Sequence, residues 1–583
     1  MKSYCVFLVS FLLAAPAFCQ TSTYAIKDVS VIPMDRETVL QDQTVVVIAG
    51  KVTAIGSTAS TKLPKKAQVI DGRGKYLIPG LTDAHVHLMT PAELPLYLVN
   101  GVTTVFNLDG RPAHLLWKKE VAESKLLGPT IFSTGPIFYG AKDLAAAVKE
   151  VDDDAAAGYD GFKIYNPVKE DQYAAVAAEV HKKNLLFIGH IARDVDVDTT
   201  LSSGQSIAHM EEFTYTYFNP KRDDQNEHIV FNEALIPTLT KQVKASGVYV
   251  VPTIDTFHDI VRQATDLNEF LTTPSLKYVA PWVLAPLQPG YDRYALNFKP
   301  DRYQYLRDSY AFQLKLIKAF GDAGVPIMAG TDSMGVGPVA GFSTHNELAE
   351  IVKAGLTPFQ ALQTSTTIPA AYLREADSAG TVAVGKKADL VLLAANPLEN
   401  IENTRQIAGV MVHGQWLDQA KLKELLDSRQ AAYSAEAGAL KKAIETNIAA
   451  ADKFERDNDP LNVMSGEALR DLVINQGYPA FAKTLDRAWN EDRQSFLVQE
   501  PAINQLGYVL IGAKRFEDAI GVLKWNTEHY PKSANTWDSL GEAYADAGDM
   551  TAAVTNYRKA LEVNPGYPNA AVAKKFVEDH PGK

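Results

Sequence analysis

Eight apolar runs alternate with helical stretches between residues 76 and 333, and this alternation limits the possible folds more than any other feature. Each run is short and almost continuously apolar, as in parallel strands that are buried on both faces. Segments such as DQYAAVAAEVHKKN and SYAFQLKLIKAFGDAG resemble helices and separate several of the runs. In chain order the runs are YLIPGLTDAHVH, VTTVFNL, TIFSTGPI, GFKIYN, LLFIGHI, SIAHMEE, VYVVPTID and PIMAGTDS.

Strands that alternate with helical crossovers in this way predict a (β/α)8 TIM barrel over residues 79–378. A doubly wound open sheet is the alternative, but no glycine-rich phosphate-binding turn opens a helix here. The long segment PLQPGYDRYALNFKPDRYQYLRDSY, between the last two runs, is dense in Tyr and Arg. We expect it either to cover the mouth of the barrel or to form a surface elaboration.

Short β-branched runs, broken by Gly and Asp, flank the barrel on both sides. YAIKDVSVIPMD, TVVVIAGKVTAIG and AQVIDGRGKYLIPG precede it, whereas GTVAVGKKADLVLLA and IAGVMVHGQWL follow it. We therefore expect residues 20–78 and 379–420 to form one small β-sandwich domain, with the barrel inserted between its two parts. Independent hairpins at the two ends are the alternative.

From residue 421 to residue 583 the chain is polar and helical, and part of it repeats every 34 residues. Leu506 and Leu540 form one such pair, and Gly507 and Gly541 form another. This region resembles an all-α tetratricopeptide repeat domain, which would brace the barrel, mediate self-association or bind a protein partner. The positions that match the repeat pattern are Trp537, Leu540, Gly541, Tyr544, Ala553, Tyr557, Ala560 and Pro565.

The first 20 residues, MKSYCVFLVSFLLAAPAFCQ, have a lysine, an apolar run and then small residues. This layout predicts a signal peptide over residues 1–19 and an exported protein, periplasmic or secreted, and the run is too short for a membrane span. A lipoprotein anchor at Cys19 is disfavoured because Phe18 precedes it. Cys5 and Cys19 are the only cysteines, and both lie in the predicted signal peptide. Any metal in the mature protein must therefore be held by nitrogen and oxygen. A net charge of −12 argues against nucleic acid as a partner.

Two histidines, His85 and His87, lie one residue apart at the end of the first run, in PGLTDAHVHLMT. Side chains alternate along a strand, so the two imidazoles point to the same side. Barrel enzymes place their catalytic groups at these strand ends. Taken alone, however, such a pair favours a hydrogen-bonded structural pair over a pair of metal ligands.

Four other runs also end in a polar side chain of the kind that binds metals or performs acid–base chemistry. Each of these side chains lies where its strand gives way to a polar turn, so a barrel would bring all of them to one mouth. For the lysine among them, an ordinary ion pair with a neighbouring acid is the alternative. The four are Lys163, His190, His209 and Asp332.

With these residues in place, the chain resembles the amidohydrolase superfamily, in its imidazolonepropionase-like and Xaa-Pro dipeptidase-like branch. The resemblance covers about residues 24–420 and includes PGLTDAHVH, GTDS, HNELAEIVKAGLTPFQALQTSTTIPAAYL and GTVAVGKKADLVLLAANPL. It implies that His85, His87 and Asp332 hold a buried metal ion and that His190 and His209 hold a second. It also implies that Lys163 bridges both ions as a carbamate formed with carbon dioxide.

The resemblance implies two divalent metal ions, zinc or else manganese, iron or cobalt, because the ligands include no thiolate. A hydroxide shared by the ions would attack a substrate carbonyl, and Asp332 would pass its proton to the leaving amine. Tyr165 lies two residues after Lys163 and is expected to donate to the developing oxyanion or to pack on a loop. His258 is a candidate for binding a substrate carboxylate, and Asp83 either orients a ligand or caps the turn.

Together these observations predict an exported binuclear metal-dependent hydrolase that cleaves an amide bond. The expected substrate is a small molecule or peptide, either a dipeptide of the Xaa-Pro kind or an N-acyl amino acid. Hydrolysis of a cyclic amide or imide, as by imidazolonepropionase, is a second possibility. A third reading is a scaffold in which the repeats bind a partner and the barrel is not catalytic; the intact set of ligands counts against it.

Overall fold

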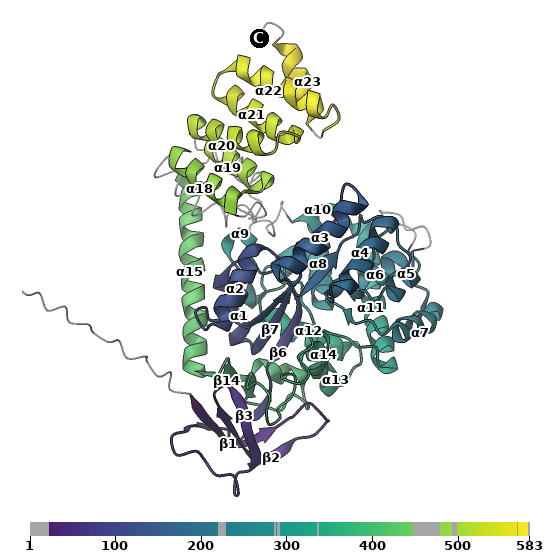
Figure 1. Ribbon diagram of the computed structural model, residues 1–583, viewed down its shortest axis with the longest axis vertical. Helices are drawn as coiled ribbons and strands as arrows, with labels where there is room; N and C mark the ends of the chain where they lie inside the picture. Colours follow the sequence, from purple (N-terminus) through teal and green to yellow (C-terminus); the bar gives the residue numbers. More distant parts are fainter. Residues whose placement is uncertain are drawn as a thin grey trace, which may run out of the picture.

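The computed structural model has a small β domain, a barrel and a C-terminal helical region (Figure 1). The predicted signal peptide and both cysteines lie outside the described part of the chain. The structure describes residues 22–219, 229–284, 287, 292–334, 337–446, 478–491, 498–512, 514–567 and 569–580.

The barrel is built from parallel strands in the order in which they occur along the chain. One sheet has the order β6-β7-β8 and a second has the order β9-β10-β11-β12. Single parallel bridges, Thr134 to Gly161 and Phe138 to Ile164, join the two sheets on one side. The strands are β6 (Leu81–Val86), β7 (Val102–Asn107), β8 (Thr130–Ser133), β9 (Gly161–Ile164), β10 (Leu186–Gly189), β11 (Ser206–Ala208) and β12 (Val250–Val251).

The eighth predicted run, PIMAGTDS (residues 326–333), is called the closing run here. It closes the barrel through single bridges, without forming a continuous strand. Ile327 bridges to Val250 of β12, and Ser333 bridges to Val86 of β6. The circle of eight parallel segments is therefore complete, as in a TIM barrel.

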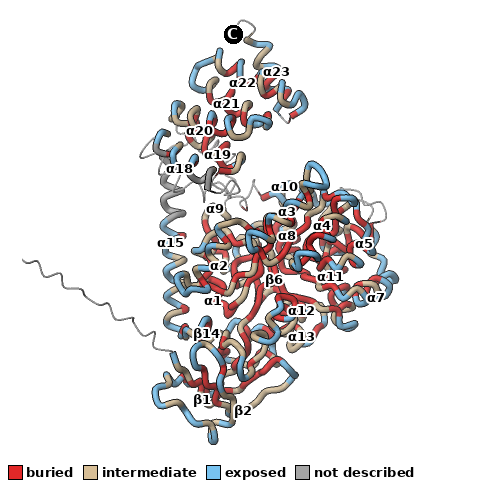
Figure 2. Tube along the Cα trace, in the orientation of Figure 1, coloured by how far each residue is buried: buried red, intermediate tan, exposed pale blue. Residues whose placement is uncertain are grey.

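Helices surround this barrel, and their apolar sides cover the strands (Figures 1 and 2). The segment between β12 and the closing run contains α9 and α10, the insertion predicted from its Tyr and Arg content. The helices are α1 (Leu94–Val99), α2 (Pro112–Ala122), α3 (Leu144–Ala157), α4 (Glu170–Lys182), α5 (Val197–Ser202), α6 (Glu211–Thr216), α7 (Ile236–Ser246), α8 (Ile254–Phe270), α9 (Pro281–Leu284), α10 (Arg293–Asn297), α11 (Tyr303–Ala323), α12 (Phe342–Lys353), α13 (Pro358–Thr364) and α14 (Thr367–Tyr372).

Segments from both sides of the barrel form the small β domain. Its sheet has the order β15-β14-β13-β5-β1-β2-β3, and β4 also pairs with β1. All eight strands belong to one hydrogen-bonded sheet, whereas the sequence predicted a sandwich; the sheet is continuous because β5 pairs with both β1 and β13. The strands are β1 (Thr23–Val31), β2 (Leu40–Ile48), β3 (Lys51–Ser57), β4 (Gln68–Asp71), β5 (Tyr76–Pro79), β13 (Leu390–Leu393), β14 (Ile407–Val412) and β15 (Gln415–Asp418).

From α19 to α23 each C-terminal helix contacts the next, and α18 contacts α20. A Cβ on Gly507 would lie 2.5 Å from the Leu523 side chain, and one on Gly541 would lie 3.1 Å from Tyr557. The two glycines, 34 positions apart, thus permit the same close approach of neighbouring helices, as a repeat would require. The tetratricopeptide identity stays a prediction. The helices are α18 (Tyr478–Glu491), α19 (Glu500–Gly512), α20 (Phe516–His529), α21 (Ala534–Asp546), α22 (Met550–Val563) and α23 (Ala570–Asp579).

A long helix, α15 (Gln419–Thr446), runs from the β domain along the barrel toward the C-terminal helices (Figure 1). Tyr433 of α15 packs with Ala280 and Val283 of the segment that contains α9, and with Met89. Met89 lies only two residues after His87, so this apolar cluster links α15 to the loop that leaves the first barrel strand.

Replacing Tyr433 by Ala should remove this contact and lower the free energy of unfolding by about 2–4 kcal/mol, because a buried aromatic ring is lost. Guanidinium-induced unfolding followed by tryptophan fluorescence measures the change. The variant Tyr433→Phe keeps the ring and should lose less than half as much. Equal losses in both variants would show that the ring contact is not the source of the stability.

Candidate metal centre

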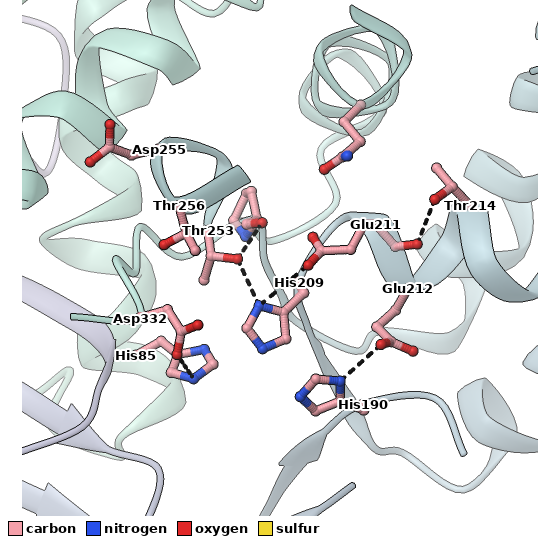
Figure 3. Close-up of polar contacts among 12 residues, drawn as sticks. His85, His190, His209, Glu211, Glu212, Thr214, Thr253, Asp255, Thr256 and Asp332 are labelled. Carbon is pink, nitrogen blue, oxygen red and sulfur yellow. Dashed lines mark hydrogen bonds and ion pairs between the residues drawn. The ribbon is translucent and has the colours of Figure 1, made fainter. Parts of the chain in front are cut away.

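Asp332 lies between the two histidines of the first barrel strand. Its Oδ1 is 3.1 Å from Nε2 of His85 and 2.9 Å from Nε2 of His87. His85 is fully buried, and burial lowers the pKa of its imidazole to about 3, so this ring is neutral at physiological pH. The strand end and the closing run thus supply two nitrogens and one carboxylate oxygen that lie close together. Figure 3 shows the contact between His85 and Asp332.

Lys163, from β9, extends its side chain toward His85 in the same group of ligands. Its Nζ is 3.0 Å from Nε2 of His85, and its side chain is buried. Burial lowers the pKa of Lys163 to about 8, which increases the fraction of neutral amine at physiological pH. The structure gives this lysine an imidazole neighbour, and among the described residues Lys163 forms no ion pair of the kind expected as the alternative.

His190 and His209 each have one ring nitrogen held by a neighbouring side chain. Nδ1 of His190 is 2.8 Å from Oε1 of Glu212, which can only accept when ionised. Nδ1 of His209 is 2.8 Å from Oγ1 of Thr253, and that hydroxyl donates its own hydrogen to the Pro252 carbonyl. Both Nδ1 atoms therefore donate, and both Nε2 atoms keep an unprotonated lone pair.

These side chains have the composition and arrangement of a metal site. Ligand atoms of His85, His209 and Asp332 lie within 4.8 Å of one another, and the rings of His190 and His209 are 4.5 Å apart. Imidazole nitrogens and a carboxylate suit zinc and related divalent metals. A hydrogen bond that fixes the opposite ring nitrogen is the usual support for a metal-binding histidine. The residues present fit a divalent metal ion.

The backbone is unusual at two of these positions. His209 has φ = 75° and Asp332 has φ = 54°, both in the left-handed region. Histidine and aspartate are among the residues that tolerate this region best, and such turns are common at functional sites. At Gly330 a Cβ would lie 2.8 Å from the Cβ of His85, so only glycine allows the closing run to approach β6 this closely.

Asp83 holds the closing run in place from below the ligands. The carboxylate is fully buried and accepts hydrogen bonds from the Thr331 amide at 3.0 Å, the Thr331 hydroxyl at 2.7 Å and the Thr344 hydroxyl at 3.0 Å. It also accepts from the His85 amide at 3.3 Å. Asp83 therefore orients the residues next to two candidate ligands, and it connects them to α12.

Glu212 and Thr253 were not among the sequence-based candidates. Glu212 is buried and binds His190 and also Arg193, whose Nη1 is 2.8 Å from Oε2. Its neighbour Glu211 lacks such a partner; burial raises the pKa of Glu211 to about 8. The acidic pair directly after the His209 strand was visible in the sequence, but the partner of each acid depends on the fold.

The two substrate-binding candidates differ in position. The ring of Tyr165 is 4.2 Å from that of His190, so Tyr165 lies beside the candidate ligands. His258 lies on α8, where its Nδ1 is 3.2 Å from Oε1 of Glu350 and its ring stacks on Tyr310. The structure thus brings Tyr165 to the site and joins His258 to side chains of α11 and α12.

The insertion also reaches the site. Burial raises the pKa of Tyr294, in α10, to about 12, and the charges of Asp332 and Glu211 add to this shift. These electrostatic effects require α10 to lie near both carboxylates. Two positions were expected for this segment, over the mouth of the barrel or on its surface. The nearness of α10 to both carboxylates agrees better with the mouth of the barrel.

The chain belongs to the amidohydrolase family, whose model matches residues 76–417. Among curated relatives, an adenine deaminase of Ruegeria sp. (strain TM1040) is 36% identical over 73 residues, 12% of each chain. Among solved structures, bottromycin amidohydrolase is 23% identical, with a TM-score of 0.58, over 70% of this chain and 90% of that one. A Xaa-Pro dipeptidase with bound methionine is 18% identical, with a TM-score of 0.52, over 68% of this chain and all of that one (100%).

These structural likenesses show the fold alone, and the curated match spans about an eighth of that relative's length. Membership of the amidohydrolase family confirms the superfamily that the sequence predicted. In the described part of the chain, no helix is both long and apolar enough to cross a membrane.

Replacing Asp83 by Ala should leave the Thr331 amide and two hydroxyls without their acceptor. We expect the free energy of unfolding to fall by about 2–4 kcal/mol, and bound metal to fall with it, because Thr331 precedes Asp332. Denaturant unfolding and elemental analysis measure the two effects. Asp83→Asn keeps one acceptor oxygen and should lose less; an Ala variant with native stability and metal content would exclude this role.

Proposed function

We propose that this chain is a metal-dependent hydrolase that cleaves an amide bond at the mouth of the barrel. The observation that carries the proposal is the convergence of the His85, His87 and His209 imidazoles and the Asp332 carboxylate. Two divalent ions, zinc or else manganese, iron or cobalt, would bind here; when bound, they supply a Lewis acid and an activated water. Their proposed ligands are His85, His87, Lys163, His190, His209 and Asp332.

Lys163 is proposed to carry a carbamate between the two ions. Its neutral amine would attack the carbon of carbon dioxide, an N–C bond would form, and one N–H proton would be released to solvent. The lowered pKa of the buried amine supports this step, because only the uncharged form has a free lone pair. The product is an anion with two oxygens, which a site for two cations requires more than an ammonium.

Asp332 and Tyr165 would each assist the reaction. Asp332 takes a proton from the attacking water and passes it to the leaving nitrogen, as a carboxylate at the centre of the ligand set can do. Tyr165 would donate a hydrogen bond to the carbonyl oxygen as negative charge develops on it. Burial raises the pKa of Tyr165, so this hydroxyl stays protonated and able to donate.

The substrate is proposed to be a dipeptide of the Xaa-Pro kind or an N-acyl amino acid. The likeness of the fold to a Xaa-Pro dipeptidase supports a dipeptide substrate. Rates on a panel of dipeptides, N-acyl amino acids and lactams would separate this proposal from a cyclic amide hydrolase. A purified, folded protein with no bound metal and no activity on the panel would favour the scaffold alternative.

Metal removal should abolish hydrolysis without unfolding the barrel. A chelator such as dipicolinate should remove close to two metal ions per chain and lower kcat by at least about 1000-fold, because the Lewis acid is lost. Elemental analysis and circular dichroism follow metal and fold, and added zinc should restore the rate. Full activity after complete metal removal would contradict the proposal.

The variant Lys163→Ala should bind less metal and lose about 100-fold or more in kcat/KM, since a bridging ligand is removed. Lys149→Ala, on the exposed face of α3, is the matched control and should behave like the unmodified protein. Metal content and kcat/KM are measured for both. A Lys163→Ala protein with full metal and full rate would rule out the carbamate.

Export and assembly complete the proposal. We propose that residues 1–19 direct the chain to the periplasm or to secretion, with a lipoprotein anchor at Cys19 as the disfavoured form. N-terminal sequencing of the mature protein would locate the cleavage site. The C-terminal helices are proposed to be tetratricopeptide repeats that brace the barrel, mediate self-association or bind a protein partner; light scattering would detect self-association.

A further inference from the structure

Glu211 has a buried carboxylate oxygen that no group of the described chain satisfies. Its Oε2 is inaccessible to solvent and accepts no hydrogen bond. Its Oε1 is 4.0 Å from Nδ1 of His209, which is too long for a hydrogen bond. That nitrogen already donates to Thr253 at 2.8 Å. Figure 3 shows the Glu211 carboxylate directed toward His209.

The nearby cation, Arg193, forms no close ion pair with Glu211 among the described residues. Arg193 forms its close ion pair with Glu212, at 2.8 Å, and Glu212 also binds His190. Two adjacent acids therefore differ in their partners: Glu212 is held by an arginine and a histidine, whereas Glu211 keeps an open acceptor. A buried carboxyl oxygen without a hydrogen-bond donor is unfavourable, and a donor supplied by a ligand would relieve this cost.

The distance of Glu211 from His209 suits the α-ammonium nitrogen of a dipeptide substrate. Nδ1 and Nε2 of one imidazole are about 2.2 Å apart, so Glu211 Oε1 lies within about 6 Å of the His209 nitrogen that faces the other ligands. In a dipeptide, the α-ammonium nitrogen is only about 2.5 Å from the scissile carbonyl carbon. An ammonium hydrogen-bonded to Glu211 would therefore hold that carbon in the neighbourhood of His209.

We propose that Glu211 binds the α-ammonium group of the substrate, so that the enzyme selects dipeptides with a free amino terminus over N-acyl amino acids. This inference rests on the proposed amide hydrolysis and narrows its substrate class. An N-acyl amino acid brings no cation and leaves Glu211 without a partner. Loss of a buried charge-assisted hydrogen bond of this kind lowers affinity or rate by about 30- to 1000-fold.

Two substrates of nearly equal shape test the proposal in the metal-loaded full-length enzyme. L-Alanyl-L-proline and N-isobutyryl-L-proline differ in that a methyl group replaces the ammonium group. The unmodified enzyme should prefer alanyl-proline by about 30-fold or more in kcat/KM. Glu211→Gln should lower kcat/KM for alanyl-proline by a similar factor and change the value for isobutyryl-proline by less than about 3-fold.

Glu233→Gln is the matched control, because Glu233 is exposed and pairs with Lys315 away from the ligands. It should change neither value. If Glu211→Gln lowers both values equally or loses metal, Glu211 supports His209 and the proposal is wrong. Unchanged values for both substrates would also overturn it. Failure of the unmodified enzyme to hydrolyse either substrate, or any amide of the panel, would instead contradict the proposed amide hydrolysis.

Discussion

The pairing of the closing run with β6 is the interaction on which both the barrel and the candidate site depend. The Ala84 amide donates to the Ala329 carbonyl at 2.9 Å, and the Asp332 amide donates to the His85 carbonyl at 2.7 Å. These bonds join parts of the chain that are more than 240 residues apart in sequence. The same bonds bring the Asp332 carboxylate to both imidazoles. Closure of the barrel and assembly of the candidate ligands therefore depend on the same backbone hydrogen bonds.

Much of the barrel could be predicted from the sequence, because buried parallel strands are short and apolar and polar residues follow them at one mouth. Lys163 and His190 were identified for this reason. The extent of pairing could not be predicted in the same way. The run VYVVPTID contributes only Val250–Val251 to a strand, because Pro252 has no amide hydrogen and Thr253 has φ = 47°. The eighth run pairs only through single bridges.

The hydrogen-bond partners of the candidate ligands could not be predicted from the sequence, for a different reason. Glu212 is 22 residues from His190, and Thr253 is 44 residues from His209. No local pattern relates such pairs, since contact arises only when neighbouring strands align their ends. Asp83 was a weak candidate, because a carboxylate before a histidine pair fits a turn cap as well as a support. Its three threonine hydrogen bonds come from the closing run and α12, which only the fold brings near.

Exclusion of water from the site favours the neutral form of both the His85 imidazole and the Lys163 amine. Burial lowers the pKa of His85 to about 3 and that of Lys163 to about 8. A neutral imidazole offers a lone pair, and a neutral amine is the form that reacts with carbon dioxide. Cations placed among these groups would meet lone pairs and carboxylates instead of positive charges. The apolar strands thus supply the chemistry of the site as well as its geometry.

The mouth of the barrel is not built by the barrel alone. Tyr433, which lies beyond the β domain in the sequence, packs on Met89 after the first histidine pair and on Ala280 before α10. One helix therefore shares a small apolar cluster with the segment after the first barrel strand and with the segment before α9. Movement of α15 would disturb both segments together, since they share this cluster.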